Sequence, residues 1–222
     1  MRAMSQPDLA ELETPRTLGR YRVLRTIARG GMAQVFEVSD PLTRERFALK
    51  WLYVDTPLAR ARFRREYEAM VRLVHPNIAR VHERGEHGGL PWMTLEYLDG
   101  QPIEEHVEAA GPPGSERRTW LAVSSVLQLA RGLEQVHRRG IVHRDIKSGN
   151  VVVLPDGRVR LVDFGIAWVD DTGQEKEREG FVGTIAYAAP EQFRGERVGP
   201  TTDLYGVGCL LYRLLTGQRP FT

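Results

Sequence analysis

Apolar and polar residues alternate in short runs over the first hundred positions, a pattern typical of β-strands. Five strands are expected, over residues 21–27, 35–38, 47–54, 78–81 and 92–97. A glycine-containing turn at 29–32 joins the first two strands. Residues 58–73 instead carry apolar positions near helical spacing, and the His75-Pro76-Asn77 run ends that pattern. The first half therefore predicts a sheet with one inserted helix.

The second half of the chain is dominated by helical patterns. One long helix is expected over 119–139 and ends at Gly140, and another over 203–216 ends at Gly217. Segregation of strands and helices predicts an α+β fold in two lobes, with a ligand cleft where the lobes meet. Residues 1–17 are polar and are expected to form a disordered leader.

Residues 141–167, IVHRDIKSGNVVVLPDGRVRLVDFGIA, concentrate the candidate chemistry of the chain. The apolar runs predict a strand–loop–strand arrangement, which places the polar residues on loops at strand ends. Asp145 can orient an attacking hydroxyl or accept its proton. Asn150 and Asp163 offer hard oxygen ligands for Mg²⁺ shared with phosphate, and Lys147 can neutralise charge on a transferred phosphoryl group. The alternative is a β-hairpin with solvated turn charges.

Lysine usage supports this interpretation independently. The chain contains 31 basic residues, of which three are lysines: Lys50, Lys147 and Lys176. A lysine kept among so many arginines is expected where a compact ammonium group cannot be replaced by a planar guanidinium. Lys147 lies in the candidate catalytic loop and Lys50 ends a predicted strand, whereas Lys176 lies in a charged run and is interpreted as incidental.

Composition narrows the class of protein further. The 41% hydrophobic and 27% charged fractions are those of a soluble globular protein, and a net charge of +2 predicts no nucleic-acid partner. No apolar run is long enough to cross a membrane, and the first residues lack the centre of a signal peptide. Cys209 is the sole cysteine, so a reducing, cytoplasmic compartment is expected. A zinc site is not expected, because the chain lacks a thiol cluster.

Several motifs together resemble those of the bacterial, eukaryotic-like (Hanks-type) serine/threonine protein kinases, over residues 18–221. They are HRD at 143–145, DFG at 163–165, the Gly183-Thr184 pair with Tyr187, and Ala189-Pro190-Glu191. The resemblance implies a two-lobed protein kinase-like α+β fold. Its N-lobe would cover residues 18–95 and consist of a small antiparallel sheet with one helix. The hinge would cover residues 96–99. A mainly helical, incomplete C-lobe would cover residues 100–222.

The resemblance also assigns roles to residues, with Asp145 and Lys147 as catalytic groups and Asn150 and Asp163 as ligands of Mg²⁺. Glu66 would pair with Lys50 to orient it toward the α- and β-phosphates of ATP; the alternative is that Glu66 is a surface carboxylate. Leu95 would be the gatekeeper before the hinge. The implied nucleotide-binding residues are Ile27, Ala28, Gly30, Gly31, Val35, Ala48, Lys50, Glu66, Glu96, Leu98 and Val152.

The sequence departs from the family pattern at several positions. In the glycine-rich loop, alanine replaces the first and third glycines, at Ala28 and Ala33, which is expected to add a small steric cost. Ser148 replaces a usual proline and is expected to reduce loop rigidity rather than activity. Glu191 lacks the arginine that a later helix would supply, so the chain is interpreted as a fragment and Glu191 as lacking its expected partner.

The expected function is transfer of the γ-phosphate of Mg-ATP to Ser or Thr hydroxyls of protein substrates. Lys147, two residues after Asp145, and Thr184 favour Ser/Thr over Tyr. The alternatives are a nucleotide-binding pseudokinase scaffold and a small-molecule phosphotransferase of kinase-like fold. Between Asp163 and Gly183 the sole hydroxyl side chain is that of Thr172, amid several carboxylates. Either these carboxylates partly replace an activating phosphate, or they are solvated and Thr172 is the phosphorylation site.

Overall fold

The computed structural model describes residues 14–164 and 185–221. The expectations for most of the leader and for Thr172, Lys176, Gly183 and Thr184 concern residues outside these ranges. The chain divides into two compact units. The first comprises Met1–Tyr67 and Val81–Tyr97, and the second comprises Glu68–Arg80 and Leu98–Thr222.

The segment Glu68–Arg80 belongs to the second unit, although the sequence pattern assigns it to the first lobe. Its backbone explains the difference. The Leu161 N–H donates to the Asn77 carbonyl and the Ala79 N–H donates to the Leu161 carbonyl, both at 2.9 Å. Ile78 thus forms an isolated parallel bridge with Leu161 and is not part of a strand of the first sheet.

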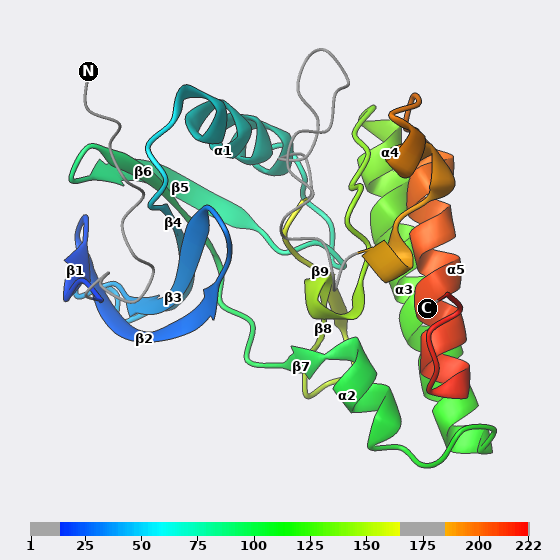
Figure 1. The fold of residues 1–222 in the computed structure, drawn as a ribbon. Helices are drawn as coiled ribbons and strands as arrows, with labels where there is room; N and C mark the ends of the chain where they lie inside the picture. Colours follow the sequence, from blue (N-terminus) through cyan, green and yellow to red (C-terminus); the bar gives the residue numbers. More distant parts are fainter. Residues whose placement is uncertain (1–13, 165–184, 222) are drawn as a thin grey trace. The chain divides into compact units, whose positions relative to one another are not determined.

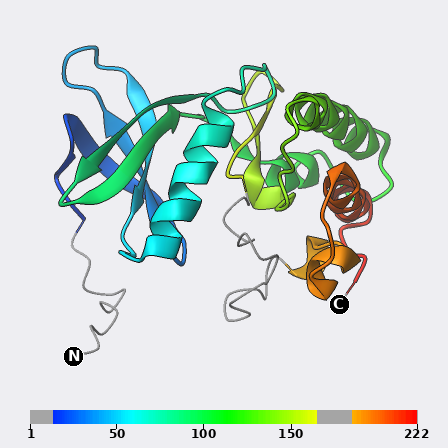
Figure 2. The ribbon, with the colours of Figure 1, turned by 90° about the horizontal axis from the view of Figure 1, so that it is seen from above.

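The first unit contains an antiparallel sheet of order β1-β2-β3-β4-β6-β5 and most of one helix, α1 (Figures 1 and 2). The elements are β1 (Thr17–Leu18), β2 (Tyr21–Arg29), β3 (Ala33–Ser39), β4 (Arg46–Leu52), α1 (Pro57–Met70), β5 (Val81–His87) and β6 (Leu90–Glu96). The strands expected in the first half are present, except that β5 begins at Val81 where the predicted 78–81 strand ends. Strand β1 is too short to give a sequence signal.

Alternation along the strands divides the sheet into two faces. On one face, Phe36 and Leu49 join a buried cluster with Leu18, Tyr21, Val38 and Trp92. Val35 and Lys50 are directly paired across β3 and β4, and Ala48 lies two residues before Lys50. These three side chains therefore share the opposite face, because successive residues of a strand point to opposite sides.

The second unit combines four helices with a small sheet of order β7-β8-β9 among its described residues. The helices are α2 (Ile103–Glu108), α3 (Glu116–Arg138), α4 (Pro190–Arg194) and α5 (Pro200–Thr216), with 3₁₀ turns η1 (Ser148–Asn150) and η3 (Ile185–Tyr187). The strands are β7 (Gln101–Pro102), β8 (Val151–Val153) and β9 (Val159–Leu161). The long helices form where the sequence predicts them, and the α+β class is confirmed.

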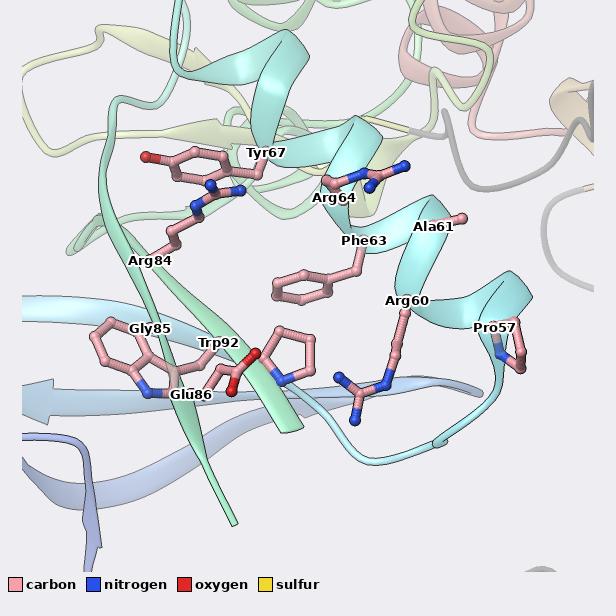
Figure 3. Close-up of a pocket in the computed structure, with 11 residues that line it drawn as sticks. Pro57, Arg60, Ala61, Phe63, Arg64, Tyr67, Arg84, Gly85, Glu86 and Trp92 are labelled. Atoms are coloured by element: carbon pink, nitrogen blue, oxygen red, sulfur yellow. The ribbon is translucent and has the colours of Figure 1, made fainter. Parts of the chain in front are cut away.

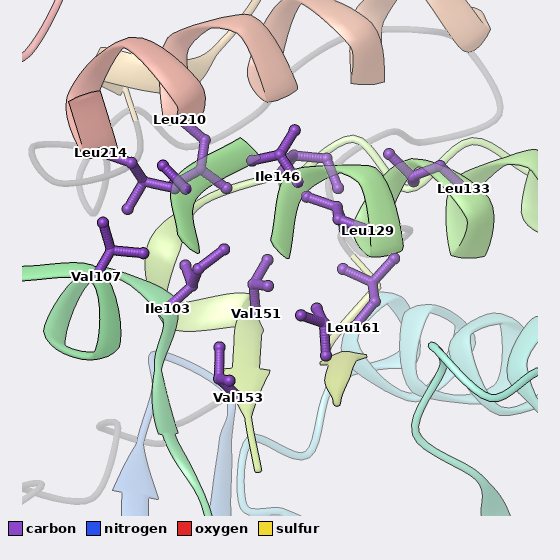
Figure 4. Packing of buried hydrophobic residues seen from close by; sticks show 13 residues of the cluster. Ile103, Val107, Leu129, Leu133, Ile146, Val151, Val153, Leu161, Leu210 and Leu214 are labelled. Atoms are coloured by element: carbon purple, nitrogen blue, oxygen red, sulfur yellow. The ribbon is translucent and has the colours of Figure 1, made fainter. Parts of the chain in front are cut away.

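The core of the second unit lies between α2, α3, α5 and the small sheet (Figure 4). Leu129 of α3, Val151 of β8 and Leu210 of α5 are fully buried there, and Ile146 of the catalytic loop packs among them. Gly206 permits this approach, since a Cβ at that position would lie 3.0 Å from the Ile146 Cβ. The core thus fixes the loop that carries Asp145.

Two further local differences separate the structure from the sequence analysis. Ile141 and Val142, the first apolar run of residues 141–167 and expected to form a strand, have no strand structure, and the Ile141 N–H donates to the Val136 carbonyl at the end of α3. The sequence analysis also gave no helix over Ile103–Glu108, a short element whose Ile103 and Val107 are buried in the core. Within the described part of the chain, no helix is long and apolar enough to span a membrane.

Candidate active site

Asp145 lies in the loop between α3 and η1, with its two carboxylate oxygens in different environments. Oδ2 accepts a hydrogen bond from the Asn150 amide at 2.8 Å and lies 2.7 Å from the Lys147 Nζ. Oδ1 is buried, and no hydrogen-bond donor contacts it among the residues that the structure describes. Asn150 and Lys147 thus fix the carboxylate through Oδ2, and Oδ1 has acceptor capacity that no described donor uses.

Asn150 joins the two polar segments of the motif region. Its amide nitrogen lies 2.8 Å from the Asp145 carbonyl and 3.4 Å from the Asp163 carbonyl, and its own backbone carbonyl accepts from the Val162 N–H at 2.9 Å. Asp163 has a left-handed backbone, with φ of 49°. The structure therefore brings Asp145, Lys147, Asn150 and Asp163 together, as the sequence predicts.

Asp203 supports this loop from the first turn of α5. Its Oδ2 accepts from the His143 N–H at 2.8 Å, and its Oδ1 accepts from the Arg144 N–H at 2.7 Å. Oδ2 also lies 2.7 Å from the His137 Nε2. Because Asp203 is almost fully buried, these contacts hold the loop rigidly. Asp203 thus braces the loop from α5; the sequence analysis did not identify the contribution of His137.

His143 is fully buried beside Phe164, with ring centroids 4.6 Å apart. Burial lowers the pKa of its imidazole, which favours the neutral ring. The neutral ring fits its contacts: Nδ1 lies 3.3 Å from the Asp145 N–H as an acceptor, and Nε2 lies 3.1 Å from the Val162 carbonyl as a donor. His143 thus fixes the backbone on both sides of the site.

The structure shows contacts for two residues at which the sequence analysis noted a difference from the family pattern, Ser148 and Glu191. The Ser148 hydroxyl accepts from the Glu104 N–H at 3.3 Å, so this residue connects the loop with the first turn of α2. Glu191 accepts a hydrogen bond from the Thr202 hydroxyl at 2.6 Å. α5 thus supplies this carboxylate with a neutral donor, which is not the arginine that the family pattern implies.

Lys50 and Glu66 form the ion pair that the resemblance implies. The Lys50 Nζ lies 2.6 Å from the Glu66 Oε1, and the Glu66 side chain is 4% exposed. Glu66 is therefore a buried carboxylate of α1 and not a surface charge. Pairing holds the ammonium group in one direction on the face of the sheet that carries Val35 and Ala48.

The proposed adenine-binding residues of the first unit lie where an apolar ligand can reach them. Val35 and Ala48 are half-buried on the Lys50 face, and Leu95 pairs with Ala48 on the same face. Ile27 is 42% exposed near the end of β2, and Glu96 ends β6. In the second unit, Val152 is half-buried between two core residues of β8, and Leu98 is half-buried near the start of the unit.

The alanines of the glycine-rich loop cause no backbone strain. Ala28 pairs with Val35, directly after a register shift in β2, and Ala33 pairs with Leu52. Neither alanine has a positive φ, nor do Gly30 and Gly31. A Cβ is therefore compatible with the conformation at residues 28 and 33.

Tyr53 restrains the same loop, a contact that the sequence analysis did not predict. Its buried hydroxyl donates to the Gly30 carbonyl, and its N–H donates to the Met32 carbonyl at 3.0 Å. Burial raises the pKa of the phenol, so it remains a donor at neutral pH. The turn between β2 and β3 is thus attached to the residue after β4.

Replacing Tyr53 with phenylalanine is expected to weaken ATP binding by about 2- to 10-fold. The change removes one hydroxyl, and a hydrogen bond contributes about 0.5–1.5 kcal/mol. The measurement is the Kd of Mg-ATP by calorimetry. Tyr212→Phe is the matched control, because that residue is exposed on α5. Equal affinity in Tyr53→Phe and wild type would show that the restraint does not affect the nucleotide.

A separate hollow of about 650 Å³ lies between α1 and the β5–β6 hairpin (Figure 3). Phe63 and Tyr67 line it from α1, and the Arg84 guanidinium stacks on the Tyr67 ring, 5.0 Å from its centroid. None of the residues assigned above to nucleotide binding or catalysis lines this hollow. It is therefore distinct from the candidate active site.

The donor set suits a hard divalent cation. The Asn150 amide nitrogen is used by acceptors of the loop, so the amide oxygen is the atom left for a ligand, and Asp163 adds a carboxylate. Oxygen donors of this kind match Mg²⁺. Within the described ranges, no group of three or more His, Cys, Asp or Glu residues is arranged to hold a metal ion.

Comparisons with known proteins agree with this geometry. The protein kinase domain family matches residues 21–222. The chain is 39% identical over 220 residues to a probable serine/threonine-protein kinase of Streptomyces coelicolor, covering 95% of this chain and 32% of that protein. It is 36% identical over 211 residues to the serine/threonine-protein kinase PknA of Mycobacterium tuberculosis, covering 91% of this chain and 48% of PknA.

A solved structure shows the same fold. The crystal structure of the Mycobacterium tuberculosis PknI kinase domain is similar with a TM-score of 0.71 and 32% identity, over 92% of this chain and 77% of that domain. The chain spans about a third to a half of the length of the two curated relatives. The matched family, the fold and the arrangement around Asp145 agree: the chain belongs to the protein kinase family.

Proposed function

We propose that this chain transfers the γ-phosphate of ATP to serine or threonine hydroxyls of protein substrates. The observation that carries the proposal is the Asp145 carboxylate, which the Asn150 amide and the Lys147 ammonium group hold through Oδ2 at 2.8 and 2.7 Å. A carboxylate held in this way can orient a hydroxyl nucleophile and accept its proton. The names of the relatives, serine/threonine-protein kinases, support the same reaction.

In the proposed reaction, the substrate hydroxyl donates its hydrogen bond to Asp145. The hydroxyl oxygen forms a bond to the γ-phosphorus, the bond from that phosphorus to the β,γ-bridging oxygen breaks, and ADP leaves. The hydroxyl proton passes to the Asp145 carboxylate and then to solvent. Lys147, whose Nζ lies 2.7 Å from Asp145, stabilises negative charge on the transferred group.

Lys50 is proposed to bind the α- and β-phosphates, in the orientation that Glu66 fixes. Asn150 and Asp163 would hold Mg²⁺, which neutralises phosphate charge when it is bound. The adenine ring would contact Ile27, Ala28, Val35, Ala48 and Val152, and the backbone of Glu96 and Leu98 would meet its edge. Gly30 and Gly31 would approach the phosphates through their N–H groups.

The proposal is tested by incubating the purified protein with radiolabelled Mg-ATP and a protein substrate, followed by phosphoamino-acid analysis. We expect phosphoserine and phosphothreonine without phosphotyrosine. Nucleotide binding without transfer would indicate the pseudokinase alternative. Transfer confined to a panel of small hydroxylated compounds would indicate a small-molecule phosphotransferase. The Lys50–Glu66 ion pair and the contacts of Asp145 with Asn150 and Lys147 support the protein kinase reaction over both alternatives.

A further inference from the structure

The Gln192 side chain connects the short helix α4 with the catalytic loop. Its Nε2 donates to the Arg144 carbonyl at 2.9 Å, and its Oε1 accepts from the Ala189 N–H at 3.0 Å. The second contact closes the first turn of α4, and the first reaches a residue 48 positions earlier in the chain. One side-chain amide group therefore hydrogen-bonds to both α4 and the catalytic loop.

Arg144 needs such support, because its backbone is left-handed, with φ of 69°. Residues other than glycine persist in this region when their surroundings fix them. The Arg144 N–H is fixed by the Asp203 Oδ1 at 2.7 Å, and the Arg144 carbonyl by Gln192. The strained residue is thus held at both of its backbone polar groups.

The peptide group between Arg144 and Asp145 is restrained at both ends as well. Its oxygen accepts from Gln192, and its N–H faces the Nδ1 of the buried His143 at 3.3 Å. The orientation of this peptide sets the direction of the Asp145 side chain. Asp203 holds the loop from α5 and His143 holds it from within the loop itself, whereas Gln192 is the restraint supplied by α4.

We propose that Gln192 is a positioning residue for the phosphotransfer reaction. It aligns Asp145 by clamping the Arg144 carbonyl, and it makes that alignment depend on the position of residues 189–192. The proposal rests on the proposed function of Asp145. It extends that function, because it links the segment that begins at Ala189 to the group that receives the hydroxyl proton.

Two substitutions separate the clamp from the helix cap. Gln192→Met keeps the length of the side chain but removes both hydrogen bonds. Gln192→Glu keeps an acceptor for the Ala189 N–H and replaces the donor to Arg144 with a carboxylate oxygen. We expect each variant to lower kcat about tenfold, near the effect of one hydrogen bond, with the KM for ATP changed less than about twofold.

The pH dependence distinguishes positioning from capping. Once protonated, the carboxyl group introduced by Gln192→Glu regains an O–H donor for the Arg144 carbonyl. The ratio of kcat between Gln192→Glu and wild type is therefore expected to rise as the pH falls from about 7.5 to about 5.5, toward the ordinary carboxyl range. The corresponding ratio for Gln192→Met is expected to stay constant. If Gln192 served α4 alone, Gln192→Glu would match wild type throughout.

Gln218→Glu is the matched control, because it makes the same change at an exposed position after α5 and should leave kcat unchanged. Hydrogen exchange gives a readout independent of activity: the Arg144 and Asp145 amides are expected to exchange faster in both Gln192 variants. If the wild-type protein transferred no phosphate, the proposed function would be refuted. Hydrogen exchange would still test whether Gln192 restrains the Arg144 carbonyl. Wild-type kcat together with wild-type exchange in both variants would overturn the inference.

Discussion

Asp145→Asn is expected to lower kcat by about 10²- to 10⁴-fold, the contribution of a positioned acid–base group. The substitution keeps the size of the side chain but removes the carboxylate that would accept the hydroxyl proton. Binding of Mg-ATP is expected to persist, because the proposed phosphate contact, Lys50, belongs to the other unit and keeps its partner Glu66. The measurement is steady-state phosphorylation of a protein substrate, with the ATP Kd measured separately.

Asp156→Asn is the matched control for this prediction. Asp156 lies in the exposed turn between β8 and β9, where it pairs with Arg158. The same chemical change at that position is expected to leave turnover within about twofold, since exposed ion pairs contribute about 0–1 kcal/mol. Turnover near the wild-type rate in Asp145→Asn, with a normal melting temperature, would remove Asp145 from the reaction.

The candidate catalytic residues could be predicted because their spacing is local. Asp145, Lys147 and Asn150 fall within one loop, and η1 turns Asn150 back toward Asp145 over five positions. The Lys50–Glu66 pair spans 16 positions, but the strand and the helix that carry it both have clear periodic patterns. In each case the sequence pattern fixes the element, and the element fixes the direction of the side chain.

The supporting contacts could not be predicted, because they depend on packing between distant segments. Tyr53 reaches Gly30 across 23 positions, Ser148 reaches Glu104 across 44, and Gln192 reaches Arg144 across 48. The sequence analysis assigned none of these three side chains a contact that supports the site. Their hydrogen bonds arise from the tertiary fold, which brings a polar side chain to an otherwise unused backbone group.

The failed strand at Ile141 and Val142 has the same origin. Both residues have high β-propensity, but that propensity reflects fit to a pleated sheet and not an intrinsic backbone preference. Here the backbone groups that follow are taken by side chains: the His143 and Arg144 N–H groups donate to Asp203. With those donors used, the segment forms a restrained loop, which is the conformation that the site requires.

Lys50→Met is expected to lower kcat/KM by about 10²- to 10³-fold, comparable to the loss of one preorganised electrostatic contact. The variant removes the cation proposed to bind the α- and β-phosphates. It also removes the ion pair that this cation forms with Glu66 at 2.6 Å. Kinetics and calorimetry with Mg-ATP measure the effect, and thermal melting measures the structural cost. Lys176→Met, in a charged run outside the described residues, is the control and should keep wild-type activity.

The double variant Lys50→Met/Glu66→Gln distinguishes the loss of phosphate binding from the loss of the ion pair between α1 and the sheet. Replacing Glu66 by glutamine removes the buried charge, so the melting temperature should recover part of the loss in Lys50→Met. Activity should not recover, because no cation is restored near the phosphates. If neutralising Glu66 restored activity as well, Lys50 would act through the stability of the first unit, and its proposed contact with the nucleotide would be wrong.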